Sequence, residues 1–370
     1  MQVQGFCEAK FLEVKNLFQS YFDEGIEEGA SLALVKNGKA LVSIYGGYTK
    51  NKQNEWSEDT IVNTFSLSKG IYAGCVAKLI DQKKLDIEKK ISFYWPEFKK
   101  SGKELIKVKD LLSHQSGLYR FKTKVTNSDL LDWEKIINIL ENQEPDHKPG
   151  QFTFYHAKTH GYLVAELIKR TTGQTLKKYF EENFNKKFNI NFKFGLDKEN
   201  IENTADLIED TKKMSLDSDA EFNAFNNPKH DVNFYNTLEW RASIVPSMGG
   251  HGSALGIAKF YDILSNDLSK NNHNIISKNL FSEILQQSTK MQDLSLNLPI
   301  RWTYSGFILR GGWMFGKNKE SFGHNGWGGS LGFGDPIEGI GISYITKKIN
   351  SGMGADMRAV NIIKKIYNSL

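Results

Sequence analysis

A serine and a lysine three residues apart, Ser66 and Lys69, are the residues of this sequence with the clearest chemical use. Ile71, Cys75 and Leu79 follow at helical spacing, which predicts a helix whose first turn carries Ser66. Side chains at i and i+3 share one helical face, so the lysine amine should lie beside the serine hydroxyl. A buried lysine tends to lose its proton, and a neutral amine can then activate the hydroxyl for acyl transfer. Free backbone N–H groups of the same turn could also bind an oxyanion. Because the pattern is short, the alternative to a catalytic pair is a helix cap followed by a surface lysine.

Tyr155 stands at a second place where the chain turns into a helix. The turn signal Pro149-Gly150 precedes it, and helical periodicity follows over residues 157–171. A tyrosine at such a corner can face a cleft, and its phenol has a reference pKa of about 10. It is a candidate for proton transfer, the alternative being an aromatic ring that packs the loop.

A glycine-rich stretch near the end of the chain contains His324, Asn325, Gly326 and Trp327. Five glycines fall within residues 323–332, just before an expected strand, and indicate that another group approaches the backbone closely. A ligand along this edge could accept hydrogen bonds from backbone N–H groups. The alternative is a bulged strand end with a loop histidine.

Two other patterns are rejected. Ser330 lies in Gly-Gly-Ser-Leu-Gly, which fits the nucleophile elbow of α/β-hydrolases, but that fold needs a histidine after the serine and all eight histidines precede Ser330. His156 and His160 have the i, i+4 spacing of a zinc site, but Ala157 follows His156, so the glutamate of H-E-x-x-H is missing. We therefore expect no metal and no cofactor.

The elements that must position these residues fall into three parts. A helix is expected over residues 9–25, followed by a hairpin in which the Asn-Gly turn of residues 36–39 joins residues 31–35 to residues 40–45. The chain then reads as mostly helical from residue 66 to about 295, with loops at 86–96 and 189–240. Its helices are expected at 66–83, 108–114, 129–142, 157–171, 175–188 and 253–266, strands return at 302–309, 312–315 and 331–344, and a last helix covers 357–367.

Strands at both ends of the chain therefore bracket a helical middle. The two ends must meet to close one sheet, so we expect residues 1–65 and 296–370 to form a discontinuous sheet domain. Residues 66–295 should form an inserted helical domain that carries Ser66 and Tyr155. Ligand pockets favour domain junctions, so the site should lie between the two.

The composition narrows the class of protein. Of 370 residues 39% are hydrophobic, enough for a sizeable core. A net charge of +5, with no Lys/Arg run longer than two residues, argues against a nucleic-acid partner. The start lacks a basic segment followed by an apolar core, and no run approaches the roughly 20 apolar residues of a membrane span, so we expect a cytoplasmic protein. Cys7 and Cys75 give no disulfide framework, and the oligomeric state is left open.

Taken together, Ser66-x-x-Lys69, Tyr155 and His324-x-Gly326, in that order, resemble the serine β-lactamase and penicillin-binding-protein superfamily, in its class C-like branch with the family VIII carboxylesterases. The resemblance spans nearly the whole chain, and further stretches that look like that branch are residues 111–118, 149–150, 161–173, 248–254 and 323–330. It implies an α+β fold of the β-lactamase/transpeptidase type. In that fold an antiparallel sheet of N- and C-terminal strands is flanked by helices and carries an inserted, mostly helical domain.

Two departures from the lactamase pattern bear on the substrate. The second motif, Y-x-N in lactamases, is Tyr-His-Ala at residues 155–157, which removes an amide that in the family helps to hold the β-lactam substituent and the lysine. The third motif, usually K-T-G, is His-Asn-Gly at residues 324–326, so a fixed cation becomes a weaker, titratable one. An alternative register places Trp-Gly-Gly of residues 327–329 there, as in some of the esterases. Both departures favour ester substrates.

The resemblance implies a serine hydrolase for small or medium acyl esters. Ser66 would attack the ester carbonyl and form an acyl-enzyme, while Lys69 and Tyr155 share the proton transfers; which of them takes the serine proton stays open. By analogy with the family, Tyr155 protonates the leaving alcohol and activates the deacylating water. The N–H groups of Ser66 and Trp327 would form the oxyanion hole, and His324 would orient Tyr155 or contact the substrate.

Alternatives to the esterase remain. Within the family they are β-lactam hydrolysis, D-alanyl-peptide hydrolysis and acyl transfer to an acceptor other than water, and the missing export signal weighs against the first two. Outside enzymes, the alternative is a binding protein that kept the fold. The expected partner is a small-molecule ester or amide, and the residues expected to bind it are Ser66, His324, Asn325, Gly326 and Trp327.

Overall fold

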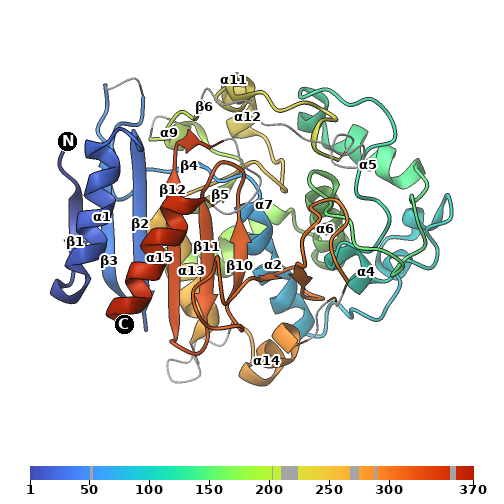
Figure 1. Cartoon of the computed structure of the whole chain (residues 1–370). Coiled ribbons are helices and arrows are strands. Elements are labelled where there is room, and N and C mark those ends of the chain that lie inside the picture. Colours follow the sequence, from blue (N-terminus) through green and yellow to red (C-terminus); the bar gives the residue numbers. More distant parts are fainter. Residues whose placement is uncertain are drawn as a thin grey trace.

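The protein combines an eight-stranded sheet with a mostly helical region beside it (Figure 1). The computed structural model describes residues 1–50, 53–201, 203–209, 224–266, 275–286, 289, 291–350 and 356–370. The strand order is β1-β3-β2-β12-β11-β10-β9-β8, so the two ends of the chain join where β2 pairs with β12. This arrangement confirms the predicted α+β fold with its antiparallel sheet.

The sheet takes three strands from the start of the chain and five from its end. They are β1 (Gln4–Cys7), β2 (Gly29–Lys36), β3 (Lys39–Gly47), β8 (Arg301–Trp302), β9 (Ile308–Leu309), β10 (Phe322–Asn325), β11 (Leu331–Asp335) and β12 (Ile340–Thr346). Every neighbouring pair is antiparallel. Asn37 and Gly38 have φ of 52° and 76° and make the predicted hairpin turn between β2 and β3.

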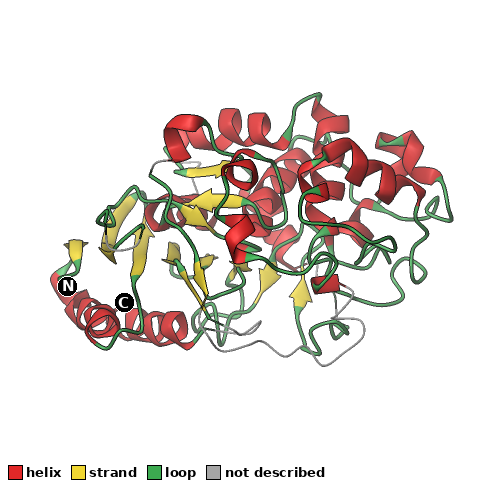
Figure 2. Cartoon of the chain, turned by 90° about the horizontal axis from the view of Figure 1, so that it is seen from above, coloured by secondary structure: helices red, strands yellow, loops and turns green. Residues whose placement is uncertain are grey.

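Helices cover both faces of this sheet (Figures 1 and 2). On one face α1 (Leu12–Asp23) lies beside α15 (Met357–Ser369), and α13 (Ala254–Ser265) packs against β2, β11 and β12 on the other. Along β2, Leu32 and Leu34 belong to the core with α1 and α15. The alternate residues Ala33 and Val35 belong to the core with α13, as the period of two in a strand requires.

The helical region contains α2 at its centre and many short helices around it. They are α2 (Leu67–Asp81), α3 (Ile91–Tyr94), α4 (Val108–Leu112), α5 (Trp133–Asn142), α6 (Thr159–Thr172), α7 (Leu176–Phe180), α8 (Lys186–Phe188), α9 (Lys198–Ile201), α11 (Val232–Tyr235), α12 (Leu238–Ala242) and α14 (Lys278–Gln286). Two small sheets join distant segments: β4 (Val62–Asn63) and β5 (Phe192–Phe194) flank β7 (Gly250–Gly252), and β6 (Ile208–Glu209) pairs with β13 (Lys348–Ile349). None of the described helices is both long enough and apolar enough to cross a bilayer.

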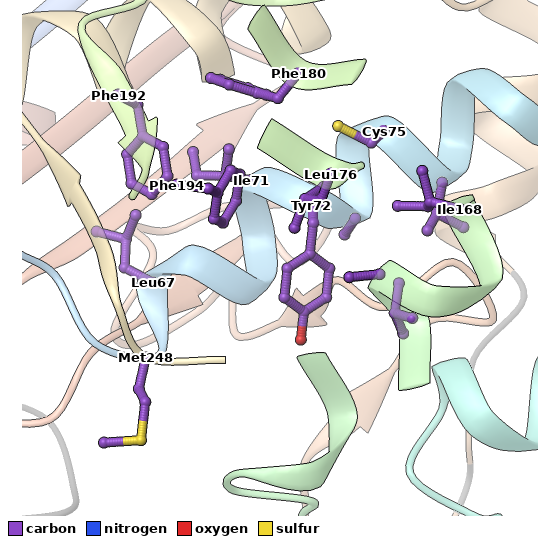
Figure 3. Close-up of a cluster of buried hydrophobic side chains, with 14 of the residues drawn as sticks. Leu67, Ile71, Tyr72, Cys75, Ile168, Leu176, Phe180, Phe192, Phe194 and Met248 are labelled. Carbon is purple, nitrogen blue, oxygen red and sulfur yellow. The ribbon is translucent and has the colours of Figure 1, made fainter. Parts of the chain in front are cut away.

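Helix α2 is buried along nearly its whole length, which fixes the position of Ser66 at its start. Its apolar side chains pack against Ile168, Phe180 and Phe192 from three different segments (Figure 3). Gly70 faces α13 and β10, where a Cβ would lie 2.1 Å from the Tyr261 hydroxyl oxygen of α13 and 3.0 Å from the His324 Cβ of β10. The absence of a side chain at this position therefore lets α2 approach the sheet closely.

Several expectations for the secondary structure are corrected. Residues 312–315 form a turn closed by the Gly312 N–H to the Gly316 carbonyl, not a strand. Residues 302–309 and 331–344 are each interrupted by a turn, giving β8 with β9 and β11 with β12, and the glycine-rich stretch itself contains β10. The expected loops at 86–96 and 189–240 include α3, β5, α9, β6, α11 and α12, although residues 202 and 210–223 lie outside the described residues. The division into a sheet domain and an inserted helical domain stays a prediction.

Candidate active site

Ser66 is the N-cap of α2 and lines a pocket between the sheet and the helical region. The residue before it, Phe65, has a φ of 48°, which is uncommon for a residue with a side chain. The Phe65 ring packs edge-on against Trp327 and Tyr235, with ring centroids 5.1 and 5.5 Å away. These contacts stabilise a strained turn that presents the Ser66 side chain, and such strain is typical of functional sites.

Lys69 is fully buried directly behind Ser66. Its Nζ atom lies 3.2 Å from the Ser66 Oγ atom, 2.8 Å from the carbonyl oxygen of Ala157 and 3.0 Å from that of Ser247. Burial, assisted by the nearby charge of Lys158, holds the pKa of Lys69 well below its usual range. A neutral amine has two hydrogens, which the two carbonyl groups accept, and its lone pair is left for the Ser66 hydroxyl.

Tyr155 lies on the other side of the serine, and its phenol is hydrogen-bonded to Ser66. The Tyr155 ring stacks on Trp302 with centroids 5.4 Å apart and an interplanar angle of 8°. The carboxylate of Asp293 accepts hydrogen bonds from the Tyr155 backbone N–H and from the Trp302 indole N–H, so it fixes both residues. Burial raises the pKa of Tyr155, and its phenol therefore stays protonated.

His324, on β10, faces the same pocket, with its ring centroid 6.2 Å from that of Tyr155. Its Nδ1 atom is 2.7 Å from the Asn325 carbonyl oxygen, so Nδ1 carries the hydrogen and Nε2 is an acceptor. Nε2 is buried and has no hydrogen-bond partner among the described residues. Burial, together with the nearby Lys69, lowers the pKa of His324 well below its usual value, so this ring is neutral.

Trp327 follows β10, and its indole lines the pocket between Phe65 and His230, with 4.4 Å between its ring centroid and that of His230. His324 thus faces the pocket from β10, and Trp327 faces it from the turn after that strand. The third motif can be aligned either at residues 324–326 or at residues 327–329, and each alignment contributes a residue to the pocket. Asn325 also lines it. Gly326 instead packs closely against the main chain before Ser66. A Cβ on Gly326 would lie only 2.1 Å from the Thr64 carbonyl oxygen.

Buried charges behind the turn fix the backbone that carries Trp327. The Gly326 N–H donates to the Ser330 carbonyl at 2.7 Å, and the Arg358 guanidinium donates to the Gly328 carbonyl at 3.0 Å. Arg358 in turn forms an ion pair with Glu27 at 2.7 Å. An ion pair buried between the two ends of the chain therefore stabilises this turn.

The two rejected patterns have structural roles. Ser330 Oγ accepts a hydrogen bond from the Thr346 N–H at 3.1 Å and does not line the pocket. His156 is hydrogen-bonded to Ser116 at 2.7 Å, and His160 to Tyr72 at 2.6 Å. In the part of the chain that the structure describes, no group of three or more His, Cys, Asp or Glu residues could hold a metal ion.

The pocket also contains residues that the sequence analysis did not single out. Its walls are mainly apolar and include Phe225, Met248, Leu296, Ile300 and Trp302. Lys158 and Arg310 line it as well. Lys158 lies three residues after Tyr155 at the start of a predicted helix, and this spacing indicates that the two side chains can lie on one side of the chain. Arg310 lies between a two-residue strand and a turn and gives no such signal.

Comparisons with known proteins identify the family of this chain. The family model described as Beta-lactamase matches residues 14–365. The protein named Esterase/beta-lactamase LipL from Mycobacterium tuberculosis is 24% identical, over 95% of this chain and 84% of its own. The crystal structure of a family VIII carboxylesterase superposes with a TM-score of 0.93 at 33% identity, and that of a penicillin-binding protein homolog from Caulobacter crescentus with a TM-score of 0.93 at 28% identity, each over 100% of both chains. A match across nearly the whole sequence, together with the shared fold, shows that this chain belongs to the beta-lactamase family.

Proposed function

We propose that this serine hydrolase is a carboxylesterase that forms an acyl-enzyme on Ser66. One observation carries the proposal: the Ser66 hydroxyl lies between the neutral amine of Lys69 and the protonated phenol of Tyr155, at the wall of a mainly apolar pocket. A base, an acid and a nucleophile are thus within reach of one bound carbonyl group.

The first step is attack of Ser66 on the ester. The Ser66 Oγ–carbon bond forms while the hydroxyl proton passes to the Lys69 lone pair, since the raised pKa of Tyr155 leaves its phenol unable to serve as the base. The resulting oxyanion would accept hydrogen bonds from the backbone N–H groups of Ser66 and Trp327. Neither N–H group donates to an acceptor within the described ranges, which supports this role.

In the second step the bond between the carbonyl carbon and the alcohol oxygen breaks. Tyr155 donates its phenolic proton to the departing alcohol and recovers a proton from the Lys69 ammonium. A water molecule then attacks the acyl carbon and loses a proton to the same pair of residues. The bond to the Ser66 Oγ atom breaks, the pair returns the proton to that oxygen, and the acid is released. Both half-reactions use the same groups, as microscopic reversibility requires.

The substrate preference is for esters over β-lactams. Ala157 stands at the position where lactamases carry an asparagine amide, and neutral His324 stands at the place of their fixed cation. The family VIII carboxylesterase at 33% identity supports the same assignment. We propose that the enzyme hydrolyses small-molecule esters in the cytoplasm and has no nucleic-acid partner. We also propose that the site lies between a sheet domain, formed by the N- and C-terminal segments, and an inserted helical domain.

The test compares hydrolysis of p-nitrophenyl acetate, butyrate and octanoate with that of nitrocefin, for the wild type and Ser66→Ala. We expect ester turnover that is lost in Ser66→Ala, with little action on nitrocefin. Nitrocefin turnover equal to that of the esters would establish a β-lactamase instead. Failure of a fluorophosphonate probe to label Ser66, together with no turnover of any substrate, would indicate a binding protein that kept the fold.

A further inference from the structure

Two basic side chains that the proposed reaction does not use line the pocket, Lys158 and Arg310. Lys158 directly precedes α6 and is 3% exposed, and its Nζ atom donates to the carbonyl oxygen of Phe225. Arg310 directly follows β9, and its Nη1 atom lies 3.6 Å from the Met314 sulfur. Throughout the described ranges, neither side chain forms an ion pair with a carboxylate.

Among the residues that the structure describes, the pocket supplies no counter-ion for these two side chains. No described Asp or Glu residue is part of its lining. Asp293 is close enough to affect Arg310 electrostatically, but hydrogen bonds already occupy its oxygens. Oδ1 accepts from the Ser295 hydroxyl at 2.8 Å, and Oδ2 accepts from the Trp302 indole at 3.1 Å. Charges withdrawn from water are normally paired, so an anion that arrives with the substrate would supply the counter-ion that Arg310, and Lys158 when it is protonated, lack among the described residues.

Both side chains lie close enough to residues of the site to affect them. Lys158 acts electrostatically on Lys69 and His230, whereas Arg310 acts on Tyr155 and His324. Because His324 is neutral, these two residues are the cationic groups of the lining that a substrate can meet. They belong to segments outside the third motif, so this anion site is independent of the cation which that motif has lost.

We propose that the natural substrates are esters that carry a carboxylate, and that Arg310 and Lys158 bind this carboxylate. The inference rests on the proposed esterase activity and narrows its substrate class. A guanidinium group presents parallel N–H donors that match the two oxygens of a carboxylate, and Lys158 adds a second donor from within the apolar wall. The carboxylate can belong to the acyl part or to the alcohol part of the ester.

The test uses two pairs of esters that differ in charge at nearly constant size. The first pair differs in the acyl part: 4-nitrophenyl hydrogen adipate carries a carboxylate there, and 4-nitrophenyl hexanoate is neutral. The second pair differs in the alcohol part: 4-acetoxybenzoate carries a carboxylate there, and 4-acetoxybenzamide is neutral. For each pair the ratio of kcat/KM, charged over neutral, is measured for the wild type, Arg310→Met, Arg310→Lys and Lys158→Met. The control is Lys124→Met, which removes a positive charge from an exposed residue.

In the wild type, the charged ester should be preferred in at least one pair. Arg310→Met and Lys158→Met should each lower that ratio by about tenfold or more, Arg310→Lys should retain part of it, and Lys124→Met should leave it unchanged. Preference for the neutral ester in both pairs, or ratios that neither substitution alters, would overturn the inference.

A binding measurement separates this inference from the esterase proposal. Monoethyl adipate is titrated calorimetrically into Ser66→Ala, which cannot turn it over, and into the same variant with Arg310→Met. Binding that weakens by about tenfold in the second protein supports the anion site even if the wild type hydrolyses no ester. Equal binding to both proteins, or no binding to either, contradicts it.

Discussion

The Nζ atom of Lys69 lies 2.8 Å from the carbonyl oxygen of Ala157, the residue that replaces the asparagine of the lactamase motif. The main chain at this position thus contacts the lysine where lactamases use a side-chain amide. A second carbonyl, that of Ser247, accepts at 3.0 Å. The lysine is therefore fixed without the asparagine, and Ala157 itself lines the pocket.

This arrangement predicts how activity depends on pH. Burial holds the pKa of Lys69 well below its usual range, and the reaction needs the lone pair of the neutral amine. The kcat/KM value for p-nitrophenyl butyrate should therefore fall as the pH decreases through this lowered pKa. Lys69→Met should reduce kcat by about 10²- to 10⁴-fold and remove that acid limb from the remaining activity.

Lys84→Met is the matched control, because Lys84 is an exposed lysine shortly after α2. It should keep both the wild-type rate and the wild-type pH profile, measured over about pH 4 to pH 9. An acid limb that persists unchanged in Lys69→Met would show that another group titrates.

Tyr155→Phe should separate chemistry from packing. The substitution removes the phenolic oxygen but keeps the ring that stacks on Trp302. We expect kcat to fall by about 10²- to 10⁴-fold while Tm changes little, as measured by ester hydrolysis and calorimetry. The control is Tyr162→Phe, which loses a buried hydrogen bond to the Leu130 carbonyl. This control should lose about 1 kcal/mol of stability and keep kcat, and the reverse pattern would contradict the assignment.

The parts of the site that the sequence predicted are those set by local geometry. Ser66 and Lys69 are three residues apart on one helix, so their contact follows from helical periodicity. Helix α2 and the hairpin turn at Asn37 and Gly38 also carry strong local patterns. The joining of β2 with β12 followed from strands at both ends of the chain.

The remaining features depend on contacts between distant segments. Lys158 donates its hydrogen bond to the carbonyl oxygen of Phe225, which is 67 residues away. Strands β8 and β9 have two residues each, too few to show a period, and β10 reads as a glycine-rich turn. Local patterns could therefore not reveal that Arg310 and Lys158 face one pocket.

Lys158 should reduce the stability of the folded protein at neutral pH. Burial lowers the pKa of Lys158 from 10.5 to about 7. Between these two pH values the unfolded chain binds a proton on Lys158 that the folded protein does not, so the contribution of this residue to the free energy of unfolding rises with pH. Lys158→Met removes that dependence. Allowing for the lost hydrogen bond to Phe225, we expect the variant to be about 1–3 kcal/mol more stable near pH 7.

Calorimetry of both proteins near pH 7 and pH 10 checks this prediction. The gain in Tm of Lys158→Met over the wild type should shrink as the pH rises, because the wild type recovers stability on deprotonation of its unfolded state. A variant that is less stable than the wild type at both pH values would contradict it. A stabilising substitution that lowers the preference for charged esters would mean that the chain retains this lysine for binding at a cost in stability.

Gly70 lies where α2 closely approaches both α13 and β10. A Cβ at this position would lie 2.1 Å from the Tyr261 hydroxyl oxygen and 3.0 Å from the His324 Cβ. Gly70→Ala should therefore displace α2 from β10 and move Ser66 relative to His324 and its strand. We expect about 1–3 kcal/mol of lost stability and a lower kcat/KM on p-nitrophenyl butyrate.

Tyr261→Phe provides the second arm of a double-mutant cycle. The Tyr261 hydroxyl is buried and has no partner among the described residues, so its removal alone should cost little. In Gly70→Ala/Tyr261→Phe the closest remaining contact is the His324 Cβ at 3.0 Å. The double variant should therefore regain most of the stability but less of the activity, because the new methyl group still presses on the strand that carries His324. If the two substitutions were simply additive in Tm, the hydroxyl would not be the obstacle, and the close packing of α2 on β10 would not depend on Gly70.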